Sequence, residues 1–342
     1  MEQDVKSLNQ KELEAVLVSL GEKPFRARQI YHWMHVRHAS SFDEMTDISK
    51  ALQEKLKAGC QMPVLRQVTV QRSKLDGTMK YLFALPDGNM VESVRMKYKH
   101  GNSVCISSQA GCRMGCRFCA STLDGLARSL TPAEMLDQVY RIQEDIGERV
   151  SHVVVMGMGE PLDNYENLIK FLEILTDENG LHISQRNITV STCGIIPNMR
   201  RLAREKLQIT LAVSLHAATQ EKRRELMPVA NKYEIHELVE ACREYFANTG
   251  RRVTFEYSLV SGVNDGAKDA VQLAGLLKGM NCHVNLIPVN PIRERDYVQS
   301  GSRAVVAFKD KLEKYGITVT VRREMGRDID GACGQLRRRQ IL

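Results

Sequence analysis

The chain has 342 residues, of which 43% are hydrophobic and 26% charged, and its formal net charge is +7. The apolar fraction is ordinary for a globular protein and excludes extensive disorder. No window approaches the roughly 18 uninterrupted apolar residues of a membrane span, and the N-terminus lacks the apolar core of a signal peptide. We therefore expect a cytoplasmic protein. The modest positive charge allows an anionic partner such as nucleic acid without requiring one.

Two accessory segments are predicted at the N-terminal end. Residues 1–60 are expected to form a small helical domain, because apolar residues recur there at helical spacing. Its helices are predicted at residues 11–20, 25–36 and 49–57. Residues 61–100 alternate with a period of two, which is typical of strands. Asp76-Gly77 and Asp87-Gly88 lie where hairpin turns are needed, so this segment is predicted to be antiparallel β structure.

Residues 101–325 alternate between strand and helix patterns. Strands are expected at residues 104–107, 152–156, 187–191, 209–214, 253–259, 284–288 and 317–321, and helices at 132–147, 165–176, 198–206, 235–249, 266–278 and 304–315. Such α/β units in series imply parallel strands, in an open doubly wound sheet or in a barrel. Six strand–helix units favour a partial (β/α)6 barrel, since a full barrel needs eight. In both architectures the active site lies at the carboxyl ends of the strands. Residues 326–342 are predicted to form a C-terminal loop and basic tail.

The loop after the first of these strands contains three cysteines, Cys112, Cys116 and Cys119, in C-x3-C-x2-C spacing. This spacing lets one short loop wrap a metal centre. Three explanations are open. Buried hydrophobic cysteines are poorly placed on such a loop. Structural zinc could take Cys105 as its fourth ligand, although Cys105 lies in a predicted strand. An iron–sulfur cluster with three thiolate ligands would leave one iron open for catalysis.

The cysteine triad, with an aromatic residue before its last cysteine, resembles the signature of the radical S-adenosylmethionine (SAM) enzymes. Further segments resemble, within that superfamily, the RNA methyltransferases of the RlmN and Cfr family: residues 104–112, 156–162, 214–216, 224–228, 262–265, 283–291 and 328–336. The resemblance covers essentially the whole chain. It implies one [4Fe-4S] cluster on the three cysteines, two SAM molecules per turnover and the partial (β/α)6 barrel.

The resemblance also implies a set of SAM-binding residues, most of them just after predicted strands. They are Gly159, Glu160, Ser191, Ser214, Leu215, His216 and Asn290. A carboxylate such as Glu160 suits the ammonium group of SAM. From the residues alone, Gly157 and Gly159 could be a plain turn, because the third glycine of a dinucleotide fingerprint is missing. The serines and the histidine could equally be structural.

Three further residues take catalytic roles by resemblance. Cys333, in a glycine-flanked loop, is the methyl carrier, and Cys105 is the resolving cysteine that forms a disulfide with it. Glu92 is the general base that removes a proton from the substrate. From the residues alone, Cys105 would be a buried strand cysteine and Glu92 an exposed strand carboxylate. Four other cysteines, Cys60, Cys193, Cys242 and Cys282, are expected to be structural.

The implied reaction is methylation of carbon 2 of an adenosine in 23S rRNA, at the peptidyl-transferase centre, and of the adenosine 3′ of the anticodon in tRNA. Carbon 2 is not nucleophilic, so ordinary methyl transfer from SAM would fail there. A Cfr-type methylation of carbon 8 is the close alternative, and Pro161 favours the carbon-2 type, because the Cfr type tends to carry Ala there. A zinc-dependent RNA-binding module is the alternative from another class.

Basic residues are candidates for contacts with RNA phosphates. Residues 61–110 hold seven Lys or Arg against three acids, residues 337–339 are consecutive arginines, and Arg322-Arg323 lie nearby. Such runs are usually solvated surface, but next to a catalytic cleft they would make RNA binding salt-sensitive. The remaining expectations are a monomer and a flavodoxin- or ferredoxin-type electron donor.

Overall fold

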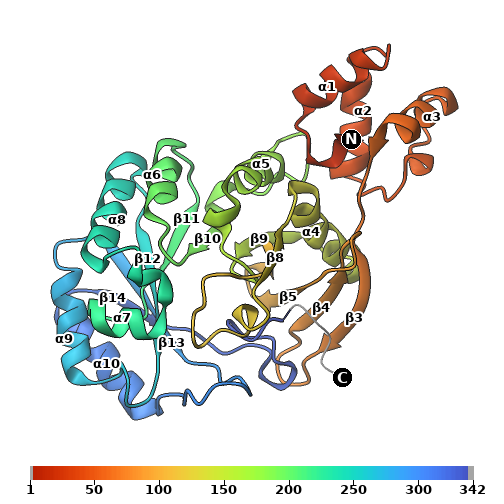
Figure 1. The fold of residues 1–342 in the computed structure, drawn as a ribbon. Coiled ribbons are helices and arrows are strands. Elements are labelled where there is room, and N and C mark those ends of the chain that lie inside the picture. The colour runs from red at the N-terminus through yellow and green to blue at the C-terminus, as the bar shows by residue number, and fades with distance from the viewer. Residues whose placement is uncertain (1–2, 338–342) are drawn as a thin grey trace.

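The structure, a computed structural model, describes residues 3–337 of the chain. One sheet of ten strands lies at its centre (Figure 1). Seven of its strands are parallel to one another: β6 (Gly101–Cys105), β9 (Val150–Val155), β10 (Ile188–Thr192), β11 (Thr210–Ser214), β12 (Val253–Leu259), β13 (Cys282–Pro288) and β14 (Thr318–Val321). Each strand of this set pairs with the next one along the chain.

This strand order distinguishes a barrel from a doubly wound sheet. A doubly wound sheet reverses its strand order at one point, whereas the seven parallel strands here follow one another without reversal. Crossovers of a single hand then place all their helices on the same face. Within residues 3–337, β14 pairs only with β13, so this part of the chain leaves the barrel open at that edge. The predicted partial barrel is therefore confirmed.

Six crossover helices match the predicted set: α4 (Pro132–Ile146), α5 (Tyr165–Thr176), α6 (Ile196–Arg204), α8 (Ile235–Thr249), α9 (Ala267–Leu276) and α10 (Ser302–Lys314). α4 begins with a capping box, in which Thr131 and Glu134 each accept the other's backbone N–H. α6 begins before its predicted start at residue 198, because proline is tolerated in a first helical turn. None of the helices within residues 3–337 has the length and apolar character needed to cross a membrane.

The β segment that precedes the barrel belongs to the same sheet. β3 (Arg66–Arg72), β4 (Met79–Ala84) and β5 (Met90–Tyr98) are antiparallel, as predicted. Gly77 and Gly88 turn the two hairpins with positive φ angles. β5 then pairs antiparallel with β6, with Val94 opposite Cys105. The first barrel strand, β6, therefore pairs with a strand on each side, β5 and β9. β5 lies beside the carboxyl end of β6, where Cys105 is found.

The N-terminal helices lie at one end of the molecule, beside α4 and α5 (Figure 1). They are α1 (Gln10–Ser19), α2 (Arg26–His35) and α3 (Lys50–Gly59), and the short strands β1 (Gln3–Asp4) and β2 (Cys60–Gln61) pair at the two ends of this segment. Lys6 donates from Nζ to Asp137 of α4 over 2.6 Å, and both side chains are buried. Asp137 also accepts the N–H of Leu65. This buried ion pair ties the N-terminal segment to the barrel.

Replacing Lys6 by Met should lower the free energy of unfolding by about 3 kcal/mol or more, because Asp137 would keep a buried charge without its principal cation. Chemical denaturation followed by circular dichroism measures the change. Lys55→Met is the matched control, since Lys55 pairs with Glu22 in a solvent-exposed position and should cost at most about 1 kcal/mol. Equal midpoints for the two variants would contradict the stabilising role of the buried pair.

Candidate active site

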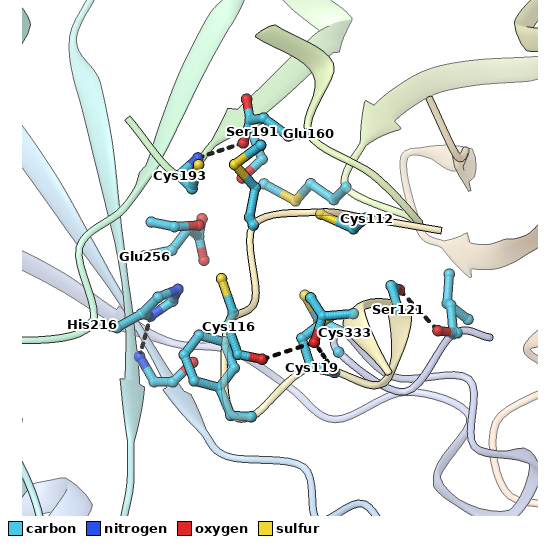
Figure 2. Close-up of a pocket in the computed structure, with 18 of the residues that line it drawn as sticks. Cys112, Cys116, Cys119, Ser121, Glu160, Ser191, Cys193, His216, Glu256 and Cys333 are labelled. Carbon is cyan, nitrogen blue, oxygen red and sulfur yellow. Dashed lines mark hydrogen bonds between the residues drawn. The ribbon is translucent and has the colours of Figure 1, made fainter. Parts of the chain in front are cut away.

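Most of the predicted site residues meet in one pocket at the carboxyl ends of the parallel strands (Figure 2). The cysteine loop after β6, the ends of β9 to β13 and the C-terminal segment line it. The predicted residues in its wall are Cys112, Cys116, Cys119, Gly159, Glu160, Ser191, Ser214, His216, Asn290 and Cys333. Parallel strands end on the same side of a barrel, which is why residues so distant in sequence meet here.

Two short strands that the sequence did not predict hold the cysteine loop. β7 (Gln109–Gly111) pairs antiparallel with β8 (Leu126–Ser129) at the ends of the loop. Gly111 has a φ of +84°, and a Cβ there would collide with the carbonyl oxygen of Gly125. Inside the loop, the N–H of Cys119 donates to the carbonyl of Cys116 over 3.2 Å. Further backbone hydrogen bonds join the loop to its surroundings, and all three cysteines line the pocket.

The three thiols form a donor set that needs a positive charge. They surround a common space in Figure 2. Burial raises the pKa of Cys112 and of Cys116 above the ordinary value, and the neighbouring thiolates act in the same direction, so that the pKa of Cys112 reaches about 12. Thiolates in such positions are stabilised by a metal centre. Three thiolates are one ligand short of a closed structural zinc site, whereas they could hold a cluster that leaves one iron open.

Glu160 presents a buried carboxylate to the same space. Its Oε2 accepts the N–H of Cys193 over 2.7 Å, and its Oε1 accepts the N–H of Leu162 over 3.0 Å. Burial raises the pKa of Glu160, and these hydrogen bonds oppose that shift. Cys193 was expected to be only structural. Its backbone N–H helps to orient the Glu160 carboxylate, and its side chain lines the pocket.

Gly159 is required for the close approach of this strand end to β7. Its φ is +102°, and a Cβ there would lie 2.6 Å from the Cβ of Gln109. Gly159→Ala should lower the free energy of unfolding by roughly 2 kcal/mol or more, through backbone strain and collision together. Urea denaturation tests this against Gly88→Ala, where φ is also positive but the space is open. A loss no larger than that of the Gly88 variant would show that the collision is relieved.

His216 is neutral and held in one orientation. Its Nδ1 accepts the N–H of Ser258 over 2.9 Å, and its ring meets the Phe118 ring edge-on at 4.8 Å. Burial lowers the pKa of His216 to about 3. Since Nδ1 accepts a hydrogen bond, Nε2 carries the proton. Leu215 differs from the other predicted residues, because its side chain is fully buried in the core and does not line the pocket.

A second pocket adjoins the first and contains both catalytic-cysteine candidates. Cys105 and Cys333 line it together, and Cys333 also lines the first pocket. Asn290 donates from Nδ2 to the Cys333 carbonyl over 3.0 Å and so helps to hold the C-terminal loop. Cys105 lies on β6 and is absent from the wall of the first pocket. It is therefore poorly placed to be a fourth ligand with the loop cysteines, which argues against the zinc explanation.

Sequence reasoning missed two charged residues of these pockets. Glu256 on β12 is buried, accepts from Asn285 over 2.9 Å and lies 3.9 Å from the Nη1 atom of Arg322. Arg322, grouped by sequence with possible RNA contacts, lines both pockets. Its charge opposes the desolvation that raises the pKa values of Cys105 and Cys333. A carboxylate in the middle of a predicted strand was the available signal for Glu256.

Glu92 lies on β5 and lines a third pocket, separate from the two that Cys333 lines. It is only 8% exposed, whereas the residues alone suggested an exposed carboxylate. The N–H of Arg337 donates to its Oε2 over 2.7 Å, and Lys80 Nζ lies 3.3 Å from its Oε1. Burial raises the pKa of Glu92, and the two basic neighbours oppose the shift. Arg293 also lines this pocket.

Comparisons with known proteins agree with this arrangement. The ribosomal RNA large subunit methyltransferase N-terminal domain matches residues 3–62, and the radical SAM superfamily matches residues 106–274. The chain is 67% identical to a probable dual-specificity RNA methyltransferase RlmN of Lachnospira eligens, over 99% of this chain and 97% of that protein. A similar relative from Lachnoclostridium phytofermentans is 59% identical, over 98% and 94% of the two chains.

A solved structure shows the same fold. The crystal structure of a radical SAM methyltransferase from Sphaerobacter thermophilus matches with a TM-score of 0.94 and 43% identity, over 98% of this chain and 100% of that chain. The superfamily match contains the cysteine loop, which favours an iron–sulfur cluster over zinc at Cys112, Cys116 and Cys119. The chain therefore belongs to the RlmN family of radical SAM methyltransferases.

Proposed function

We propose that this protein methylates carbon 2 of an adenosine in 23S rRNA, and of the adenosine 3′ of the anticodon in tRNA, through an S-methyl group carried by Cys333. The position of Cys333 carries the proposal. Its side chain lines the pocket of the loop cysteines and also the pocket of Cys105. A methyl carrier needs access to both pockets. It would receive and activate its methyl group beside SAM, and the second thiol would then release the product from it.

The first pocket would hold a [4Fe-4S] cluster on its three loop cysteines and SAM on the opposite wall. When bound, the reduced cluster supplies the electron that cleaves SAM to a 5′-deoxyadenosyl radical. The Glu160 carboxylate, fixed by two backbone donors, would accept from the ammonium group of SAM beside Gly159. Ser191, Ser214, Asn290 and the Nε2–H of His216 would orient the rest of the molecule.

Cys333 must be a thiolate to accept a methyl group from a first SAM, since the thiolate is the nucleophile. Arg322 lines the pocket beside it and favours that form electrostatically. The sulfur–carbon bond of SAM breaks as the new bond to Cys333 forms. The S-methyl group of Cys333 would then give one hydrogen atom to the radical derived from a second SAM, and its carbon, left with an unpaired electron, would bond to carbon 2 of adenine.

Release of the product then requires a base and a second thiol. Glu92 would remove the proton from carbon 2, and burial raises its pKa toward the range that suits a base at neutral pH. Cys105 would attack Cys333, so that a disulfide forms as the bond between sulfur and the methylene carbon breaks. Before this cleavage, the radical adduct would pass its unpaired electron to an oxidised one-electron carrier, such as a flavodoxin- or ferredoxin-type protein. The electron pair of the broken sulfur–carbon bond, with one proton, would then complete the new methyl group. A flavodoxin- or ferredoxin-type protein would deliver electrons to the enzyme.

The third pocket supports an RNA substrate that reaches Glu92 from outside. Lys80, Arg293 and Arg337 line it around the carboxylate, and such side chains suit phosphate contacts. A base inside a helix cannot reach a buried group, so the adenosine would have to leave its stack.

Nucleoside analysis tests the proposal. Anaerobically purified protein should first show about four iron and four labile sulfide per chain, with little zinc. It is then incubated with SAM, a reductant and either a 23S rRNA fragment or a tRNA transcript, and the RNA is digested for mass spectrometry against authentic standards. We expect 2-methyladenosine from both RNAs. A product that co-elutes with 8-methyladenosine would establish the Cfr-type reaction instead, and zinc without sulfide would revive the binding-module alternative.

A further inference from the structure

Arg223 is a buried guanidinium without a carboxylate partner in the described chain. It lies on the short helix α7 (Gln220–Leu226) and is 0% exposed. Its Nη2 donates to the Cys193 carbonyl over 2.7 Å and its Nη1 to the Tyr233 carbonyl over 3.4 Å. Its buried Nε–H has no hydrogen-bond partner. Because an isolated buried charge is strongly unfavourable, such a group needs a compensating negative charge.

The segment that carries Arg223 packs against the cysteine loop. The N–H of Arg117 donates to the Leu226 carbonyl over 3.0 Å, which joins the end of α7 to the loop. Leu226 and Met227 belong to a small apolar cluster that includes Cys193 and contacts Cys116. Leu226 and Met227 belong to residues 224–228, a segment that resembles the family but to which the sequence analysis gave no role. The guanidinium thus lies on the protein side of the loop, away from solvent.

One peptide unit connects Arg223 to the proposed SAM-binding carboxylate. The Cys193 carbonyl accepts from Arg223, while the N–H of the same residue donates to Glu160. Glu160 is therefore linked to Arg223 through this peptide unit, and Cys116, a proposed cluster ligand, packs against the apolar cluster that contains Cys193. The thiolate forms of Cys193 and Cys116 are the largest influences that oppose the burial-lowered pKa of Arg223.

We propose that Arg223 is a positioning residue for the iron–sulfur centre, whose fixed charge offsets the negative charge of the cluster and favours its reduced form. The inference rests on the proposed function, because it requires a cluster on Cys112, Cys116 and Cys119. Reduction adds one electron, supplied by the protein donor or by a chemical reductant, and forms no bond. A nearby buried cation stabilises the more negative state preferentially, and so raises the reduction potential.

The test compares reduction potentials in holoenzyme variants without RNA. Arg223→Gln removes the charge but keeps an N–H donor for the Cys193 carbonyl, and Arg223→Lys keeps the charge. Reductive titration followed by electron paramagnetic resonance gives each midpoint. The Gln variant should be at least tenfold harder to reduce, which for one electron is a shift of about 59 mV to lower potential. The Lys variant should stay within a few-fold of wild type.

Arg224→Met is the matched control, since Arg224 neighbours Arg223 on α7 but pairs with Glu234 at the surface. Its potential should equal that of wild type. A Gln variant that binds a full cluster with an unchanged midpoint potential would show that Arg223 has only a structural role. If the Gln variant does not fold, a Lys variant that binds a full cluster yet is tenfold harder to reduce overturns the inference, because its charge is retained. Absence of iron and sulfide from the wild type would instead defeat the proposed function itself.

Discussion

The Cys333→Ala variant is expected to lose RNA methylation by at least about 10³-fold while it keeps its full content of iron and sulfide. Cys333 lines the pocket of the loop cysteines, but it lies on the C-terminal segment and is not one of the three loop thiols. Removing its sulfur should therefore remove the methyl carrier without disturbing the cluster. Single-turnover assays with radiolabelled SAM, together with iron and sulfide analysis of the same sample, measure both properties.

Cys282→Ala is the matched control for this variant. Cys282 begins β13, is buried and lines neither pocket that contains Cys333. We expect it to methylate RNA at close to the wild-type rate. Methylated RNA formed by Cys333→Ala at a rate similar to that of the control would refute the carrier role. Loss of iron from Cys333→Ala would mean that this cysteine supports the cluster.

The Cys105→Ala variant is expected to become covalently attached to its RNA. Cys105 and Cys333 line one pocket, and no other cysteine lines it. Without the second thiol, the bond between Cys333 and the adenosine should form and then persist. A species of reduced mobility that contains both protein and RNA should therefore appear on denaturing gels, in up to one equivalent per chain, and should disappear after nuclease treatment.

The double variant Cys105→Ala/Cys333→Ala provides the control, because it has no sulfur to which the adenosine could attach. It should give no adduct under the same conditions. If Cys105→Ala turns over normally and remains free of RNA, another group must release the product. An adduct that persists in the double variant would place the attachment on a residue other than Cys333.

The local patterns predicted the barrel well because each of its units is encoded over a short stretch. α5 and α8 have the predicted bounds, since apolar residues recur at helical spacing along them. Gly77 and Gly88 form their turns as predicted, because a positive φ is inexpensive only for glycine. β7, β8 and α7 were missed because they are too short for a period to emerge. All three adjoin the cysteine loop: β7 and β8 pair at its ends, and the end of α7 is hydrogen-bonded to it.

The candidate site shows the same division. The cysteine loop and the strand-end residues could be found from spacing and resemblance, because parallel strands always end on one side. The roles of Glu256, Arg322 and Arg223 could not be found in this way. Each role depends on which charges and backbone groups surround the side chain in three dimensions, even where, as for Glu256, the local sequence offered a signal. Leu215 was predicted together with its two neighbours; successive residues along an extended chain face opposite sides, and the side chain of Leu215 faces the core.

By itself, the sequence determined the order of strands and helices and the family, and it predicted a set of reactive cysteines, because these are properties of spacing and residue type along the chain. Only the tertiary structure decided that β5 adds to the barrel at β6, that Cys105 and Cys333 share a pocket, and that Glu92 lies in a separate one. Those facts depend on strand register and on the burial of charges. Both arise from long-range packing, which no local pattern records.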